Sequence, residues 1–333
     1  MNPIAYFAPA NTAAALLHAE DINANFIAGG TNLIDLMKER VTQPRVLVDI
    51  NGLPNDSIRE TDGGGLMLGA GVRNATTAYD PLVRARYPLL SAAILAGASP
   101  QIRNMASNGG NLLQRTRCHY FYDVAVPCNK REPGSGCSAI GGLTRQHAIL
   151  GASDQCIAVH PSDMCVALAA LDAVVHVQST RGQRRIAFAD FHRLPDGEPQ
   201  RDTTLLIGEL ITHIELPPAA RFAAHSAYLK LRDRASYAFA LVSVAAALDI
   251  GEDGLVRQVR VALGGVAHKP WRVPAAEALL ANSEPSIAAF DQLADALLTG
   301  ARGQGDNDFK ILMARRAIVR ALEYAAFGNQ GVS

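Results

Sequence analysis

The sequence predicts an α+β protein of two or three domains, on three observations. At 333 residues, 49% of them hydrophobic, the chain can bury more than one core. Its first part alternates short apolar runs with helical patterns, as β-α-β units do. Its last part has extended strand patterns followed by helical ones, which favours an antiparallel sheet covered by helices. We expect domains at 1–55, 56–220 and 221–333, with Pro217-Pro218 marking the second boundary.

Composition and charge exclude several kinds of partner. The 31 basic and 31 acidic residues leave no net charge, so nucleic acid and anionic membrane surfaces are not expected as partners. No apolar run reaches 18 residues, so membrane insertion is not expected. Residues 1–37 contain no Lys or Arg, and acidic Glu20 and Asp21 follow the first helical pattern. That charge is wrong for a signal peptide, and we expect none in this chain.

The first part of the chain predicts a β-α-β unit with a glycine turn. Residues 11–19 have helical spacing, and Asn25 to Ala28 is a short buried strand pattern that runs into Gly29-Gly30-Thr31-Asn32. A helix pattern follows from Leu33, with Thr31 or Asn32 as its N-cap, and Val46 to Ile50 is the next strand. Paired glycines before a helix N-terminus suit a diphosphate, although a purely structural turn has the same pattern. The turn is neither Gly-x-Gly-x-x-Gly nor a P-loop, so a Rossmann nicotinamide site is not supported.

A second glycine turn follows in the middle of the chain. Leu66 to Val72 is a third strand pattern, and Tyr87 to Ala98 is an apolar helix ended by Ser99-Pro100. The turn itself is Ser107-Asn108-Gly109-Gly110-Asn111. Alone, this segment is equally typical of a surface turn. Two such turns favour one nucleotide-sized ligand shared between them.

Residues 115–156 form the most unusual stretch, a predicted long ordered loop with four of the five cysteines. Cys118, Cys128, Cys137 and Cys156 are separated by nine, eight and eighteen residues. Four thiolates could hold an iron–sulfur cluster or a zinc ion, and a third interpretation is that the thiols bind no metal. A tight Cys-x2–4-Cys knuckle, common in zinc sites, is absent from the sequence.

We interpret other residues near the loop as structural. We expect Cys165 to be a buried small residue in an apolar helix over 164–171, begun by Ser162. Ordinary structural roles are expected for His119, His147 and His160.

The rest of the chain predicts strands and then helices. Strand patterns lie at 174–178, 186–188, 210–216, 227–232, 240–249 and 256–263, and helical ones at 273–281, 285–299 and 308–326. Lys230, Arg232 and Arg234 alternate along one strand, either towards a ligand or as a solvated face.

Several motifs together resemble a known family. Ala28-Gly-Gly-Thr-Asn-Leu33, Gly109-Gly-Asn111, Pro161-Ser-Asp163 and Val261-Ala-Leu-Gly-Gly-Val266 are similar to the FAD-binding medium subunits of molybdenum hydroxylases, the xanthine dehydrogenase family. The cysteine loop looks most like that of the flavin and [4Fe–4S] subunit of bacterial periplasmic aldehyde oxidoreductases. The resemblance covers almost the whole chain. It implies a two-part FAD-binding domain of the vanillyl-alcohol-oxidase (PCMH) type, followed by a smaller α+β C-terminal domain.

The resemblance also implies site residues. The FAD-binding residues would be Ile27, Ala28, Gly29, Gly30, Thr31, Asn32, Leu33, Ile34, Ser107, Gly110, Asn111, Asp163, Ile211 and Lys230. The ligands of a [4Fe–4S] cluster would be Cys118, Cys128, Cys137 and Cys156. No catalytic residue is implied, because substrate oxidation would occur in a partner subunit.

The function implied by the resemblance is electron transfer within a heterotrimer. A large molybdenum-cofactor subunit would oxidise an aldehyde, and a small [2Fe–2S] subunit would pass electrons to FAD in this chain for an external acceptor. Co-export with a signal-bearing partner would make the protein periplasmic, with the cytoplasm as the alternative. Two other functions are weighed: a self-contained FAD-dependent oxidase, and a zinc-stabilised scaffold protein without flavin.

Overall fold

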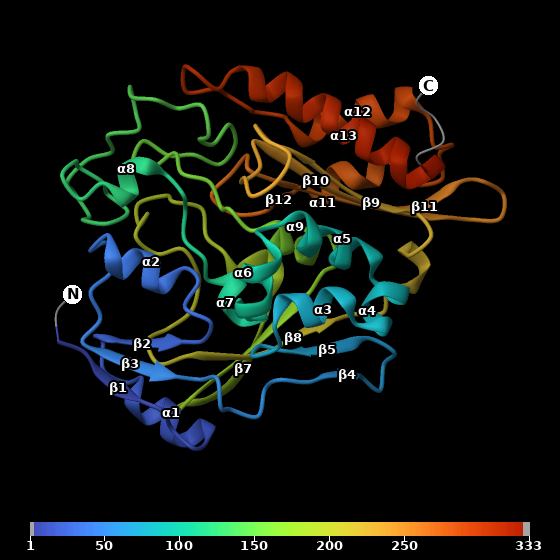
Figure 1. Ribbon diagram of the computed structural model, residues 1–333. Coiled ribbons are helices and arrows are strands. Elements are labelled where there is room, and N and C mark those ends of the chain that lie inside the picture. The colour runs from blue at the N-terminus through green and yellow to red at the C-terminus, as the bar shows by residue number, and fades with distance from the viewer. Residues whose placement is uncertain (1–2, 329–333) are drawn as a thin grey trace.

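A computed structural model describes residues 3–328 and contains three β-sheets with helices between and around them (Figure 1). We call them the N-terminal, central and C-terminal sheets. The α+β class predicted from the sequence is confirmed. Within residues 3–328, no helix is long and apolar enough to cross a membrane.

The N-terminal sheet is parallel, with the strand order β1-β3-β2. Its elements are β1 (Ala5–Phe7), α1 (Thr12–His18), β2 (Ala24–Ile27), α2 (Leu33–Lys38) and β3 (Val46–Asp49). Asn11 begins α1, because its side chain accepts a hydrogen bond from the Ala14 amide at 2.9 Å. The predicted β-α-β unit is therefore present. Strand β1 was not predicted, since all three of its residues are exposed and it has no apolar alternation.

The central sheet is antiparallel, with the order β4-β5-β8-β6-β7. Its strands are β4 (Ile58–Glu60), β5 (Leu66–Gly69), β6 (Val174–Ser179), β7 (Gly182–Ala187) and β8 (Leu210–Leu216). The helices of this region are α3 (Asn74–Tyr79), α4 (Pro81–Arg86), α5 (Pro88–Ala96), α6 (Pro100–Met105), α7 (Asn108–Leu112), α9 (Asp163–Ala170) and α10 (Phe188–Phe191). Pro81, Pro88 and Pro100 each open a helix, where the missing N–H is not needed.

The C-terminal sheet is also antiparallel, with the order β12-β11-β10-β9. Its strands are β9 (Ser226–Leu231), β10 (Val242–Ile250), β11 (Val256–Gly264) and β12 (Trp271–Arg272). The surrounding helices are α11 (Pro274–Glu277), α12 (Ile287–Leu297), α13 (Phe309–Phe327) and the short 3-10 turns η1 (Ala220–Phe222) and η2 (Ala278–Leu280). In Figure 1, α12 and α13 cover one face of this sheet, and α5 and α9 lie between its other face and the central sheet.

Strand β10 is buried on both faces, and its side chains alternate in size. Val242, Val244 and Leu248 belong to the core under α12 and α13. Ala245 and Ala247 belong to the core shared with α5 and α9. Small residues on the second face let two helices approach the sheet closely, which places the start of α9 at the large cavity described below.

The predicted long loop joins α7 to α9, and its one helix is α8 (His119–Tyr122). The loop is ordered by its own polar side chains. The Asn129 side chain accepts hydrogen bonds from the amides of Gly134 and Gly136, at 3.1 and 2.8 Å. Lys130, whose side chain is 1% exposed, forms an ion pair with Asp202. These contacts hold the loop against the segment that precedes β8.

Candidate functional site

The two predicted glycine turns lie against each other. Gly29 packs on the connection between α6 and α7 so tightly that a Cβ atom there would lie 1.9 Å from the carbonyl oxygen of Met105. Gly30 has φ of +69°, a left-handed conformation that favours glycine. The meeting of two backbone segments therefore requires Gly29, and the left-handed backbone favours Gly30, whether or not a ligand is bound.

A cavity of about 810 Å³ opens beside these turns. Small-molecule and cofactor sites usually measure roughly 300–1,000 Å³. The cavity is lined by residues of the β2–α2 turn, by α7, by Asp163 and Lys230, and by the loop 233–239 after β9. Segments from all three parts of the chain therefore build one binding space.

Asn32 occupies the N-cap position of α2, as expected, but does not cap the helix with its side chain. Its side-chain oxygen instead accepts a hydrogen bond from the amide of Arg115 at 2.9 Å. Its side-chain nitrogen lies 3.5 Å from the hydroxyl of Tyr122. No side chain caps the first amides of α2, and the Ile34 amide donates to the carbonyl oxygen of Gly30 at 3.0 Å. The Asn32 contacts tie the glycine turn to the start of the cysteine loop.

The second turn is fixed by its polar side chains. Ser107 begins α7, and its hydroxyl accepts a hydrogen bond from the Gly110 amide at 3.2 Å. Asn108 is fully buried and bonds to Thr77 at 2.8 Å, so its role is structural. The side-chain oxygen of Asn111 accepts a hydrogen bond from the Ser162 hydroxyl at 2.6 Å, which links this turn to the start of α9.

A buried ion pair lies on the cavity wall. Lys230 Nζ is 2.7 Å from Asp163 Oδ2, and the two side chains are only 5% and 8% exposed. The Tyr228 hydroxyl donates a hydrogen bond to the other carboxylate oxygen at 2.7 Å. Burial and the adjacent Asp163 charge raise the pKa of Tyr228 well above its ordinary value, so this phenol stays protonated as a donor. The carboxylate of Asp163 is thereby oriented at the cavity by two partners.

Twelve of the fourteen residues predicted to bind the cofactor line this cavity. They are Ile27, Ala28, Gly29, Gly30, Thr31, Asn32, Leu33, Ser107, Gly110, Asn111, Asp163 and Lys230. The structure does not bring Ile34 and Ile211 to its lining. Ile211 is 4% exposed within the core between the central sheet and its helices, and Ile34 is 39% exposed on α2.

Sequence reasoning missed other residues that line the cavity, including three from the cysteine loop and the segment after β9. Arg117 and Gln146 come from the cysteine loop, and Phe239 follows β9. The guanidinium of Arg117 lies over the Phe239 ring, 4.9 Å from its centroid. The charge alternation after Lys230 gave a partial signal, since Arg234 also lines the cavity. Nothing local in the sequence indicates that the cysteine loop faces residues 237–239.

The four predicted metal ligands line a second, smaller cavity. Cys118, Cys128, Cys137 and Cys156 all border it, and all four are free thiols. Cys128 and Cys137 pair across an isolated antiparallel bridge. Burial, with additional repulsion from neighbouring thiols, raises the pKa of Cys118 to about 12 and that of Cys156 to about 11. These thiols would therefore stay protonated at neutral pH unless a metal displaces their protons.

The spacing of the four sulfurs disfavours a single zinc ion. Tetrahedral zinc, with Zn–S bonds of about 2.3 Å, would hold its sulfurs roughly 3.8 Å apart. Among the residues that the structure describes, no three of these cysteines have sulfurs that all lie within 4.8 Å of one another. The four sulfurs are thus spread more widely than the ligands of a single zinc ion.

A buried cation, Lys130, and its half-buried partner Asp202 lie near this cavity. Lys130 approaches Cys156 closely enough to counteract part of the rise in its thiol pKa. Burial opposes ionisation of Asp202, but Lys130 and Arg115 hold the pKa of this carboxyl well below its usual range. The Lys130 ammonium therefore lies next to the thiols and is already paired with the Asp202 carboxylate.

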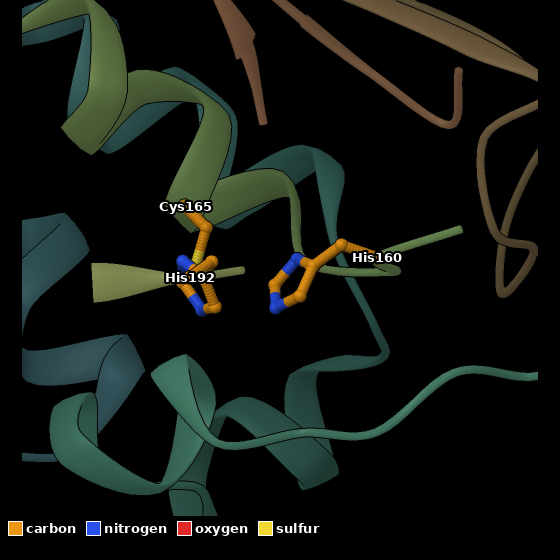
Figure 2. Close-up of side chains that lie close together, drawn as sticks. All are labelled: His160, Cys165 and His192. Atoms are coloured by element: carbon orange, nitrogen blue, oxygen red, sulfur yellow. The ribbon is translucent and has the colours of Figure 1, made fainter. Parts of the chain in front are cut away.

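The fifth thiol, that of Cys165, forms a separate buried group with two histidines, shown in Figure 2. Ligand atoms of His160, Cys165 and His192 lie within 4.8 Å of one another. His160 Nδ1 accepts from the Ser162 amide at 3.3 Å, which leaves the proton of the neutral ring on Nε2. With one histidine oriented as a donor, the group is a poor metal site. Cys165 is fully buried in α9, as expected for a packing residue.

Comparison with known proteins supports the expected family. Residues 2–219 match the family described as the FAD binding domain in molybdopterin dehydrogenase, and residues 226–325 match the CO dehydrogenase flavoprotein C-terminal domain. The chain belongs to the FAD-binding medium subunits of the molybdenum hydroxylases.

Relatives of this family are similar over most of their length. The chain is 50% identical to the aldehyde oxidoreductase FAD-binding subunit PaoB of Escherichia coli (strain K12) over 94% of this chain and 95% of that protein. It is 29% identical to the nicotine 6-hydroxylase medium subunit of Paenarthrobacter nicotinovorans over 85% of this chain and 82% of that protein. The carbon monoxide dehydrogenase structure from Hydrogenophaga pseudoflava matches with a TM-score of 0.74 and 26% identity, covering 97% of both chains. The expected fold of this family is confirmed.

The size and the polar groups of the large cavity fit the FAD of this family. Its volume, the two glycine turns that let a ligand approach the backbone, and the buried Asp163–Lys230 pair suit an extended ligand with a diphosphate and several hydroxyls. When bound, FAD would supply electron-transfer chemistry. The protein's part is to shape the space and supply the polar contacts.

Proposed function

We propose that this chain is the FAD-binding electron-transfer subunit of a heterotrimeric aldehyde oxidoreductase. Its partners would be a large molybdenum-cofactor subunit that oxidises the aldehyde and a small [2Fe–2S] subunit that delivers electrons. FAD suits this position because it can accept electrons singly and release them in pairs to an external acceptor. The 50% identity to an aldehyde oxidoreductase subunit over nearly the whole chain supports the aldehyde as substrate class.

The convergence of the two glycine turns and the Asp163–Lys230 pair on one cavity carries this proposal. We infer that the twelve lining residues predicted from the sequence hold FAD, together with Arg117, Gln146 and Phe239. Asp163 can accept hydrogen bonds from hydroxyl groups of the cofactor, and Lys230 places positive charge beside it.

The four loop cysteines are proposed to bind a [4Fe–4S] cluster. The support is chemical: four free thiols border one cavity, their spacing is too wide for a single zinc ion, and Lys130 stands beside Cys156. The cluster would also lower the effective proton affinity of thiols that burial otherwise keeps protonated.

We further propose that the assembled enzyme acts in the periplasm, exported with a partner that carries the signal. Cell fractionation tests this directly, because recovery of the assembled enzyme in the cytoplasmic fraction would contradict it.

The proposed function is tested on the purified chain without partners. Its absorption spectrum should combine flavin bands with the broad brown absorption of an iron–sulfur cluster, and metal analysis should find iron and not zinc. The same preparation should not oxidise aldehydes. Aldehyde turnover by the partner-free chain would instead support a self-contained oxidase, and a colourless zinc protein would support a scaffold.

A further inference from the structure

His147 is in direct contact with one of the four thiols. Its ring nitrogen Nε2 lies 3.1 Å from the sulfur of Cys118, and the residue is 2% exposed. Its other ring nitrogen, Nδ1, has no hydrogen-bond partner within the described part of the chain. The contact with Cys118 is therefore the one polar interaction that the His147 ring makes there.

The direction of this hydrogen bond follows from metal binding. A cysteine bound to iron is a thiolate and carries no proton. The proton between the two atoms must then belong to the imidazole, with Nε2–H donating to the sulfur. Hydrogen bonds to ligand sulfurs are one of the features that set the potentials of iron–sulfur clusters.

Lys310, a residue of α13, is completely buried and contacts the backbone of His147. Its ammonium donates to the carbonyl oxygens of His147 at 2.8 Å and Gly265 at 2.6 Å. Within residues 3–328, no carboxylate forms an ion pair with it, and burial lowers its pKa to about 7. A buried cation without a counter-charge is costly, and a negatively charged group nearby would offset that cost.

Cys118 also lines a small space that adjoins the large cavity. The space lined by Cys118, His147 and Gly265 also borders Asp163 and Phe239, which line the large cavity. None of the other three loop cysteines lines this space among the described residues. A hydrogen bond at Cys118 therefore acts on the side of the thiol group that is turned towards the proposed FAD site.

We propose that His147 and Lys310 are positioning residues that raise the reduction potential of an iron–sulfur cluster on the four cysteines. The inference rests on the proposed cluster. Reduction adds negative charge to the cluster. A hydrogen-bond donor on a ligand sulfur and a buried positive charge both stabilise the reduced form more than the oxidised one. Lys310 acts by holding the His147 backbone and by its charge.

The test is an EPR-monitored redox titration of the full-length protein containing iron and FAD, at pH 6, where the Lys310 ammonium predominates. His147→Phe removes the donor and keeps a ring of similar size. His147→Gln restores an N–H donor, and Lys310→Met removes the charge but keeps the chain length. His119→Phe is the matched control, because His119 is an exposed histidine of the same loop whose ring contacts His147 without bonding to a cysteine sulfur.

We expect the cluster midpoint potential to fall in His147→Phe and in Lys310→Met, to recover at least partly in His147→Gln, and to stay unchanged in His119→Phe. A wild-type potential in an iron-replete His147→Phe protein would overturn the inference. If that variant loses iron, Lys310→Met decides, and a wild-type potential there overturns it equally. Absence of iron from the wild-type protein would overturn the proposed cluster and this inference with it, and is recognised because every sample then lacks the EPR signal.

Discussion

Gly29 illustrates how a single residue can be required by the fold and by a binding site together. Its α-carbon faces the Met105 carbonyl so closely that no side chain fits. The same approach brings the β2–α2 turn and the start of α7 to one cavity. Asn32 has a comparable double role, since its side chain accepts a hydrogen bond from the Arg115 amide of the cysteine loop and the residue also lines the cavity.

Replacing Gly29 with Ala should weaken FAD binding at least tenfold, roughly 1.4 kcal/mol, because the new methyl group would force the two turns apart. Fluorescence titration of the flavin-free protein with FAD measures this. Gly52→Ala is the matched control, since a Cβ atom at Gly52 would meet nothing within 4 Å. Equal FAD affinity in Gly29→Ala and wild type would show that the close approach is not needed for binding.

At the scale of elements, the cysteine loop is an insertion with its own anchors. It is tied to the N-terminal sheet through Arg115 and Asn32, and to the segment before β8 through Lys130 and Asp202. Of its described residues 115–156, Arg115, Arg117 and Gln146 line the large cavity. The large cavity is therefore built mainly by elements outside the loop.

Cys128→Ser should remove iron and lower the midpoint of thermal unfolding while FAD stays bound. The reason is that Cys128 faces the thiol cavity and is absent from the lining of the large one. Iron content, flavin absorbance and calorimetry on one preparation check all three effects. Cys165→Ala, outside the group of four, should keep its iron. Complete loss of flavin from a folded Cys128→Ser protein would mean that the two sites form one unit.

At the scale of the whole molecule, buried histidines join segments that are distant in sequence. His192 lies 2.9 Å from the carbonyl oxygen of Leu112, and His268 lies 3.0 Å from that of Arg193. Burial lowers the pKa of each to about 4. The folded protein therefore holds both rings neutral, whereas the unfolded chain would protonate them near pH 6.5.

The stability of the protein should consequently fall as the pH drops from about 6.5 towards 4. In this window the unfolded chain binds more protons than the folded one, so the loss is on the order of 3 kcal/mol for each histidine. Below this range the lowered pKa of Asp202 adds a further loss. Urea unfolding at several pH values measures the slope, which should be shallower in His192→Gln. A stability independent of pH between 7 and 5 would contradict the buried, neutral state of these rings.

The sequence by itself determined most of the elements and most members of the site. Apolar periodicity located β2, α2, β3, α5, α9 and the strands and long helices of the C-terminal sheet, because these patterns record local backbone geometry. Glycine pairs and clustered cysteines indicated candidate sites in the sequence, because few other residues can replace them. The division at 1–55, 56–220 and 221–333 stays a prediction.

Only the tertiary structure decided which side chains face a common space. It placed Ile211 in the core and joined Arg117 to Phe239 across 122 residues of chain. It also brought the His147 ring into contact with the Cys118 sulfur and the Lys310 ammonium to the His147 carbonyl oxygen. Such contacts depend on how sheets and loops pack over long sequence separations, and no local pattern of residues encodes that packing.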